Sequence, residues 1–149
     1  MKMKSLPILA AFMFFLCCTW LVSAADKEAT PEEPMDSLVL AMSTDNVAIF
    51  DAAITIGNVA LRRGHTVTML LRVDSVKVAV AKNNYPVDNT TLSKKLSAFM
   101  ESGATVVAGG SCMKQMGLKQ GDLVRGVVVG TPDLVMGTLF RKDTKILSY

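Results

Sequence analysis

The sequence TVVAGGSCMKQMGL, residues 105–118, decides the fold expected for this chain. It opens with an apolar run of strand length at 105–108, passes through two glycines, and then shows helical spacing up to Gly117. A buried strand, a tight turn and a helix start make up the first half of a βα unit. We therefore predict a parallel α/β arrangement in which Cys112 lies where a helix begins.

Cys112 is the candidate nucleophile. The first N–H groups of a helix have no partner inside it, and the positive end of the helix dipole favours an anion there. A thiol in this place is expected to ionise more easily than a free cysteine, and the thiolate is the reactive form. Gly109 and Gly110 would allow close approach, and N–H groups from Ser111 to Lys114 would stabilise the anion. The alternative is a buried cysteine that packs as a small hydrophobe.

Arg72 is a further candidate for the same site. The run at 66–73 predicts a strand, and Arg72 lies near its carboxyl end, where ligands of open α/β sheets gather. Because Cys112 would lie at that edge too, Arg72 and Lys114 could hold the thiolate or an anionic group. A solvent-facing arginine explains Arg72 equally well. His65, the sole histidine, has no ligand cluster at metal-binding spacing around it, so no metal site is expected.

Residues 1–24 have the pattern of a secretory signal peptide: two lysines, an apolar run at 6–22, and then small residues. An uncleaved membrane anchor is the alternative, since the run approaches the ~18 apolar residues that a span needs. Residues 25–36 are rich in charge and proline and are expected to form a linker to a domain at 37–149. A cleaved leader would make the protein periplasmic or secreted, without membrane attachment.

The charge balance excludes an electrostatic basis for binding nucleic acid. Of the 16 lysines and arginines, two lie in the leader, and the remainder nearly balance the 13 acidic side chains. A nearly neutral domain is not drawn to phosphates or to an anionic membrane surface. Cys112 is the only cysteine outside the leader, so no intramolecular disulfide is expected. A lone thiol is uncommon in an oxidising compartment.

Strand and helix patterns alternate along the rest of the domain. Apolar runs of strand length occur at 37–43, 66–73, 105–108, 125–130 and 144–149. Helical spacing occurs at 47–63, 92–102 and 133–140, with a short helix expected at 74–81 and a polar loop at 82–91. This order leaves little room for hairpins, and it predicts a mostly parallel sheet with helices on both faces.

The order of elements and two segments, VVAGGSCMKQMGL and the closing GVVVGTPDLVMGTLFRKDTKILSY, resemble the DsrE/DsrF-like (YchN-like) proteins. The resemblance covers residues 37–149. It implies a three-layer α/β/α fold with a mainly parallel five-stranded sheet, and it implies a homo-oligomer, either a trimer or a hexamer. The best-understood members of that family are cytoplasmic sulfur carriers, which hold a persulfide on a cysteine and pass it to a partner.

The resemblance carries over to the site in part. Counted back from Gly117, Cys112 matches the second cysteine of a paired motif found in some members. Gly109 stands at the place of the first cysteine, which is the carrier in the sulfur-relay members. This chain therefore keeps a thiol one helical turn later and cannot form a Cys-x-x-Cys disulfide. The leader is a second departure, because an exported protein would meet sulfide or polysulfide in place of cytosolic partners.

Two hypotheses for the function follow. In the first, the protein is an exported sulfur-relay-type protein that binds or carries a persulfide on Cys112, exchanging sulfur with a donor or acceptor protein or a small sulfur compound. In the second, it is an oligomeric interaction or small-ligand module in which Cys112 only packs. A hydrolase or nucleotide-binding enzyme is disfavoured, because G-x-S-x-G, G-x-G-x-x-G and the phosphate-loop lysine motif are missing. No cofactor is expected, and the sequence leaves open whether the protein is an enzyme.

Overall fold

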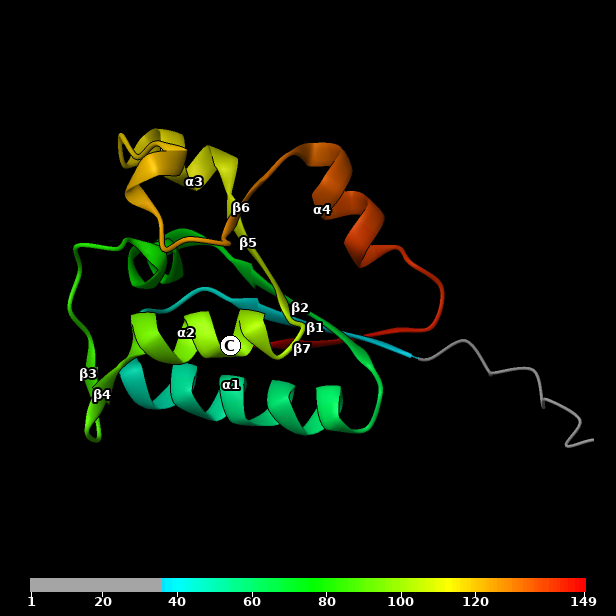
Figure 1. Ribbon diagram of the computed structural model, residues 1–149. Coiled ribbons are helices and arrows are strands. Elements are labelled where there is room, and N and C mark those ends of the chain that lie inside the picture. Colours follow the sequence, from blue (N-terminus) through cyan, green and yellow to red (C-terminus); the bar gives the residue numbers. More distant parts are fainter. Residues whose placement is uncertain (1–35) are drawn as a thin grey trace, which may run out of the picture. The chain divides into compact units, whose positions relative to one another are not determined.

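The computed structural model describes residues 36–149 (Figure 1). The predicted signal peptide at 1–24 lies outside the described residues, and so does the predicted linker at 25–36 except for Asp36. Within the described part, strands and helices alternate from β1 at the amino end to β7 at the carboxyl end, except for a small hairpin before the second helix and a 3-10 turn after the third.

Five parallel strands form the sheet, in the order β6-β5-β2-β1-β7. Their bounds are Ser37–Met42 (β1), Thr66–Leu71 (β2), Thr105–Gly109 (β5), Val128–Gly130 (β6) and Thr144–Ser148 (β7). The two central strands are in register along their whole length, from Ser37 opposite Thr66 to Met42 opposite Leu71. The predicted α/β class and the parallel five-stranded sheet are therefore confirmed.

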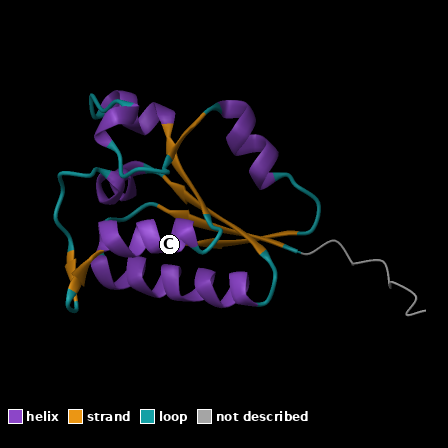
Figure 2. Ribbon diagram, in the orientation of Figure 1, coloured by secondary structure: helices purple, strands orange, loops and turns teal. Residues whose placement is uncertain are grey.

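The helices cover the two faces of the sheet unequally (Figures 1 and 2). Helices α1 (Val47–Arg62) and α2 (Leu92–Glu101) lie side by side on one face, and α4 (Pro132–Leu139) lies over the other. Helix α3 (Gly110–Gln115) and the 3-10 helices η1 (Val73–Ala79) and η2 (Gln120–Asp122) lie toward the carboxyl ends of the strands. One face thus carries two long helices and the other a single short one.

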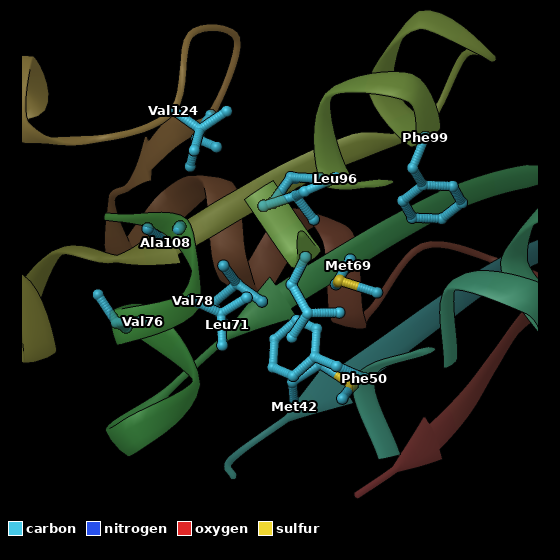
Figure 3. Packing of buried hydrophobic residues seen from close by; sticks show 14 of the residues in the cluster. Met42, Phe50, Met69, Leu71, Val76, Val78, Leu96, Phe99, Ala108 and Val124 are labelled. Carbon is cyan, nitrogen blue, oxygen red and sulfur yellow. The ribbon is translucent and has the colours of Figure 1, made fainter. Parts of the chain in front are cut away.

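The main core lies between the sheet and the pair α1 and α2 (Figure 3). Phe50 from α1 and Phe99 from α2 are almost completely buried there, together with Met42 and Met69 from the central strands. Helix α1 passes close to α2 at Gly57, where an added Cβ would lie 2.5 Å from Cζ of Phe99. A glycine is needed at that point because any side chain would push the two helices apart.

A smaller cluster fills the opposite face of the sheet. Val39, Leu70 and Val107 come from three neighbouring strands, and Val135 and Leu139 of α4 pack against them. Alternation along each strand sends successive side chains to opposite faces, so both faces need a cover. On this face the cover is α4.

Two strands predicted from the sequence are shorter in the structure. The predicted buried strand at 125–130 reduces to β6, because Gly126 has a φ of +98° and the N–H of Val127 donates to the carbonyl of Val124 in a turn. The predicted strand at 66–73 ends at Leu71, and η1 begins at Val73. The short helix expected at 74–81 is this 3-10 helix.

The loop predicted at 82–91 contains a small hairpin that the sequence interpretation missed. Strand β3 (Pro86–Val87) pairs antiparallel with β4 (Thr90–Thr91). Asp88 between them has a φ of +49°, which aspartate tolerates better than most residues. The hairpin leads directly into α2, whose first turn is capped by the side chain of Thr91.

Candidate functional site

Cys112 lies at the carboxyl edge of the sheet, as the sequence predicts. Strand β5 ends at Gly109 and α3 begins at Gly110, so Cys112 is the third residue of the helix. Its thiol is free and partly buried, and it packs against the edge of the main core. The sequence predicts that the helix begins at Cys112, and in the structure it begins two residues earlier, at Gly110.

The thiol of Cys112 accepts a hydrogen bond from the neighbouring chain segment. The backbone N–H of Val73, which directly follows the end of β2, points at Sγ with an N-to-S distance of 3.2 Å. Val73 has a φ of +50°, and such a left-handed backbone is unfavourable for a β-branched residue. The sulfur of Cys112 therefore has a hydrogen-bond donor beside it in addition to its packing against the core.

Ser75 holds this strained turn in place. Its hydroxyl is fully buried and accepts a hydrogen bond of 2.7 Å from the N–H of Arg72. The same oxygen lies 2.9 Å from the carbonyl of Met42 and 2.6 Å from that of Arg72, within donating distance of both. Ser75 therefore ties the carboxyl ends of β1 and β2 together just before Val73. The sequence analysis assigns 74–81 to a short helix and missed this role of Ser75.

The two glycines of the predicted turn leave room for different neighbours. At Gly109 an added Cβ would lie 3.2 Å from the carbonyl oxygen of Leu71 and 3.6 Å from Sγ of Cys112. At Gly110 it would lie 2.7 Å from the carbonyl oxygen of Gly130. Gly110 thus lets the end of β6 approach the turn, whereas Gly109 leaves room directly beside the sulfur.

Arg72, Ser111 and Lys114 are exposed residues that lie at the same carboxyl edge of the sheet as Cys112. Among the hydrogen bonds and ion pairs of residues 36–149, none joins the side chain of Arg72, Ser111 or Lys114 to Cys112. Their predicted roles at the thiol therefore stay predictions. The direct neighbour of the sulfur in the structure is the backbone of Val73, which the sequence interpretation did not name.

A second polar group lies on the same side of the sheet and was also missed. Lys77 of η1 pairs with Asp74 at 2.6 Å, and this hydrogen bond and the charge of Asp74 raise the pKa of Lys77. The hydroxyl of Tyr85 donates to a carboxylate oxygen of Asp45 at 3.0 Å. Partial burial, and then this hydrogen bond, raise the pKa of Tyr85. The loop after β1 and the segment after η1 are thereby tied together.

Residues 36–149 hold no cluster of three or more histidine, cysteine, aspartate or glutamate side chains that could bind a metal ion. His65 lies at the opposite, amino edge of the sheet, in the turn before β2. In the same part of the chain, no helix combines the length and the apolar character that crossing a membrane requires.

Comparison with known proteins identifies the fold. No protein-family model matches the sequence, and no curated protein matches it either. Among solved structures, the YchN protein from E. coli superposes with a TM-score of 0.64, covering 77% of this chain and 99% of that one. The fold is YchN-like. At 14% sequence identity the likeness concerns the fold alone, and at that level it confirms the resemblance drawn from the sequence.

Two further structures share the YchN-like fold. MTH1491 from Methanobacterium thermoautotrophicum has a TM-score of 0.64 at 14% identity, covering 76% of this chain and 99% of that chain. BT1422 from Bacteroides thetaiotaomicron has a TM-score of 0.60 at 23% identity, covering 76% and 95%. Both are described as proteins of unknown function. The shared fold therefore assigns an architecture, and the function has to be argued from the site.

Proposed function

We propose that the protein binds or carries sulfur as a persulfide on Cys112. The observation that carries this proposal is the contact between Sγ of Cys112 and the N–H of Val73, made at the carboxyl edge of a parallel sheet. A cysteine that only packs needs no hydrogen-bond donor at its sulfur. The left-handed backbone of Val73 that supplies this donor is energetically unfavourable. The same donor would stabilise a thiolate before loading and a persulfide anion after it.

The chemistry requires a donor that already contains sulfur in the sulfane state. The thiolate of Cys112 attacks the outer sulfur of a polysulfide or of another persulfide, one S–S bond forms, and one S–S bond of the donor breaks. The donor leaves one sulfur shorter as an anion, so charge and electrons balance. Sulfide alone cannot load the cysteine without an oxidant, because sulfide and a thiol are at the same oxidation level.

The surroundings of Cys112 determine which sulfur donors can reach it. Gly109 leaves space beside Sγ, and the partly exposed Cys112 can be reached by a small polysulfide or by the exposed cysteine of another protein. Arg72 and Lys114 lie at the same edge of the sheet and would attract an anionic donor. Because residues 1–24 have the sequence pattern of a signal peptide, we propose that the exchange takes place in the periplasm or outside the cell, in the oxidation or trafficking of inorganic sulfur compounds.

Transfer of the sulfur to an acceptor tests the proposal. The purified protein is incubated with polysulfide, freed of excess reagent and treated with cyanide, which removes an outer persulfide sulfur as thiocyanate and returns the cysteine as thiolate. We expect close to one thiocyanate per chain, and none from Cys112→Ser treated in the same way. Thiocyanate that persists in Cys112→Ser at the level of the native protein would refute the assignment. A chain that releases none would leave Cys112 as a packing residue.

A further inference from the structure

The sheet face under α4 changes from apolar to hydroxyl-bearing along three neighbouring strands. Val39, Leu70 and Val107 form its apolar part and pack against α4. Since alternate residues of a strand share a face, the residues two positions earlier in each strand face the same side. These three residues all carry hydroxyl groups: Ser37 of β1, Thr68 of β2 and Thr105 of β5. A polar strip therefore adjoins the small core, toward the amino ends of the strands.

A cavity of about 350 Å³ lies over this polar strip. Ser37, Thr68 and Thr105 line it from the sheet, and α4 with the segment after it lines the other side. None of the side-chain hydrogen bonds within residues 36–149 uses the hydroxyls of these three residues. The volume lies in the range of about 300–1,000 Å³ that is usual for small-molecule sites. The cavity is therefore large enough for a small polar ligand and offers it several hydroxyl groups.

Two opposite charges line the same cavity. Asp133 lies in the first turn of α4, and Arg141 lies two residues after the end of that helix. None of the ion pairs within residues 36–149 includes Asp133 or Arg141, so the two side chains do not neutralise each other. Both charges are available to a bound molecule that itself carries one cationic and one anionic group.

Gly137 leaves the helical wall of this cavity open. The glycine lies in the middle of α4 and lines the cavity, and an added Cβ there would meet no atom within 4 Å. The packing of the chain therefore does not require glycine at this position, and glycine is a poor residue for a helix interior compared with alanine. A larger side chain at position 137 would take up space that a ligand could use.

We propose that this cavity binds a free α-amino acid. Arg141 binds the carboxylate of the ligand, Asp133 binds its ammonium group, and the hydroxyls of the polar strip bond to its remaining polar atoms. A simple anion fits less well because Asp133 repels it, and Arg141 likewise repels a simple cation. Cys112 lies at the carboxyl edge and packs against the main core on the other face of the sheet, so this site is separate from the proposed sulfur site.

Calorimetric titration of the purified protein with each of the common L-amino acids tests the proposal. We expect at least one of them to bind with a Kd of about 1 mM or lower. The methyl ester of that amino acid lacks the negative charge and its N-acetyl derivative lacks the positive charge. Each should bind at least about tenfold more weakly, which corresponds to about 1.4 kcal/mol. A protein that binds no amino acid at about 10 mM would overturn the proposal, and so would equal binding of either derivative.

Variants of the cavity wall test the location of the site. Gly137→Leu should abolish binding and leave thermal unfolding unchanged or improved, because the new side chain enters open space. Gly121→Leu is the matched control and should bind like the native protein, since a Cβ at Gly121 also meets nothing within 4 Å and Gly121 lies in η2.

Variants of the two charges test the roles of the charged groups. Asp133→Asn and Arg141→Gln should each weaken binding at least about tenfold. Arg125→Gln changes an exposed arginine outside the cavity lining and should have no effect, and Cys112→Ser should bind like the native protein. Binding that survives both Gly137→Leu and Arg141→Gln would overturn the proposal, whereas loss of sulfur uptake in Cys112→Ser with intact amino-acid binding would support two separate sites.

Discussion

The strain at Val73 can be tested by substituting it with glycine and with alanine. Both substitutions keep the backbone N–H that donates to Cys112, and both remove the side chain, which is 56% exposed. Only glycine relieves the φ of +50°, because alanine has a Cβ and meets the same restriction as valine. The difference between Val73→Gly and Val73→Ala therefore isolates the backbone strain.

The expected difference in the free energy of unfolding between the two variants follows from two opposing contributions. A non-glycine residue held in the left-handed region costs about 1–3 kcal/mol. The extra freedom of glycine in the unfolded chain removes about 0.5–1 kcal/mol of that gain. Val73→Gly should therefore be more stable than Val73→Ala by about 1 kcal/mol, which corresponds to roughly 3–6 °C in the unfolding temperature of a domain of this size.

Thermal and urea unfolding of the two variants measure this difference. The control is Ala52, an exposed residue within α1, where alanine should be more stable than glycine by about 1 kcal/mol. The order of stability should thus be reversed between the two positions. If Val73→Ala is as stable as Val73→Gly, or more stable, the backbone at Val73 is not strained and the turn does not force its N–H toward sulfur.

Three other predictions concern the packing and charge of the domain. Ser75→Ala should lower the free energy of unfolding by about 1 kcal/mol, because the buried hydroxyl accepts from the N–H of Arg72 and donates to one of the two nearby carbonyls, while the N–H of Arg72 keeps its bond to the carbonyl of Met42; denaturant unfolding measures it, and an unchanged midpoint contradicts it. Gly57→Ala should cost about 1–3 kcal/mol through its clash with Phe99, although alanine is the better helix former. A second substitution, Phe99→Leu, should reduce the cost of the first, and strictly additive losses in the double variant would argue against the clash. Tyr85 should titrate above the ordinary tyrosine pKa of about 10, because burial and the bond to Asp45 favour its neutral form. Its contribution to stability is present below that ordinary pKa and is lost as the pH rises through the raised value. Phenolate absorbance, with Tyr85→Phe to assign the signal, measures the pKa; Asp45→Asn should lower it, and an unchanged titration would contradict the contact.

The sequence predicts the architecture well, because the physics that decides it is periodic and local. The apolar run at 105–108 followed by two glycines predicts the strand, the turn and the helix start that bring Cys112 to the carboxyl edge. Buried parallel strands are continuously apolar, and glycine or asparagine marks the ends of their helices, so most boundaries agree to within one or two residues. The same rules fail at 125–130, where Gly126 breaks an apolar run that would otherwise suit a longer strand.

The neighbours of the thiol could not be predicted, because none of them follows from a local pattern. No propensity suggests a left-handed conformation at a valine, and Val73 adopts it in a turn where Ser75 bonds to the end of a different strand at Met42. The contact from Val73 to Cys112 joins segments 39 positions apart. The pair of Asp45 and Tyr85 likewise depends on how two loops meet. Tertiary structure decides such contacts, and the sequence indicates only that they lie near one edge.

The proposed function requires that Cys112 takes up sulfur. Intact-mass spectrometry of the purified protein, before and after incubation with polysulfide, measures this, with Cys112→Ser treated in parallel and sulfide without oxidant as the reagent control. We predict that the native chain gains the mass of one sulfur atom, that a reductant reverses the gain, and that Cys112→Ser shows no corresponding gain. A native chain that gains no mass, or a gain that Cys112→Ser shares in full, would contradict the account and leave Cys112 a packing residue at the end of β5.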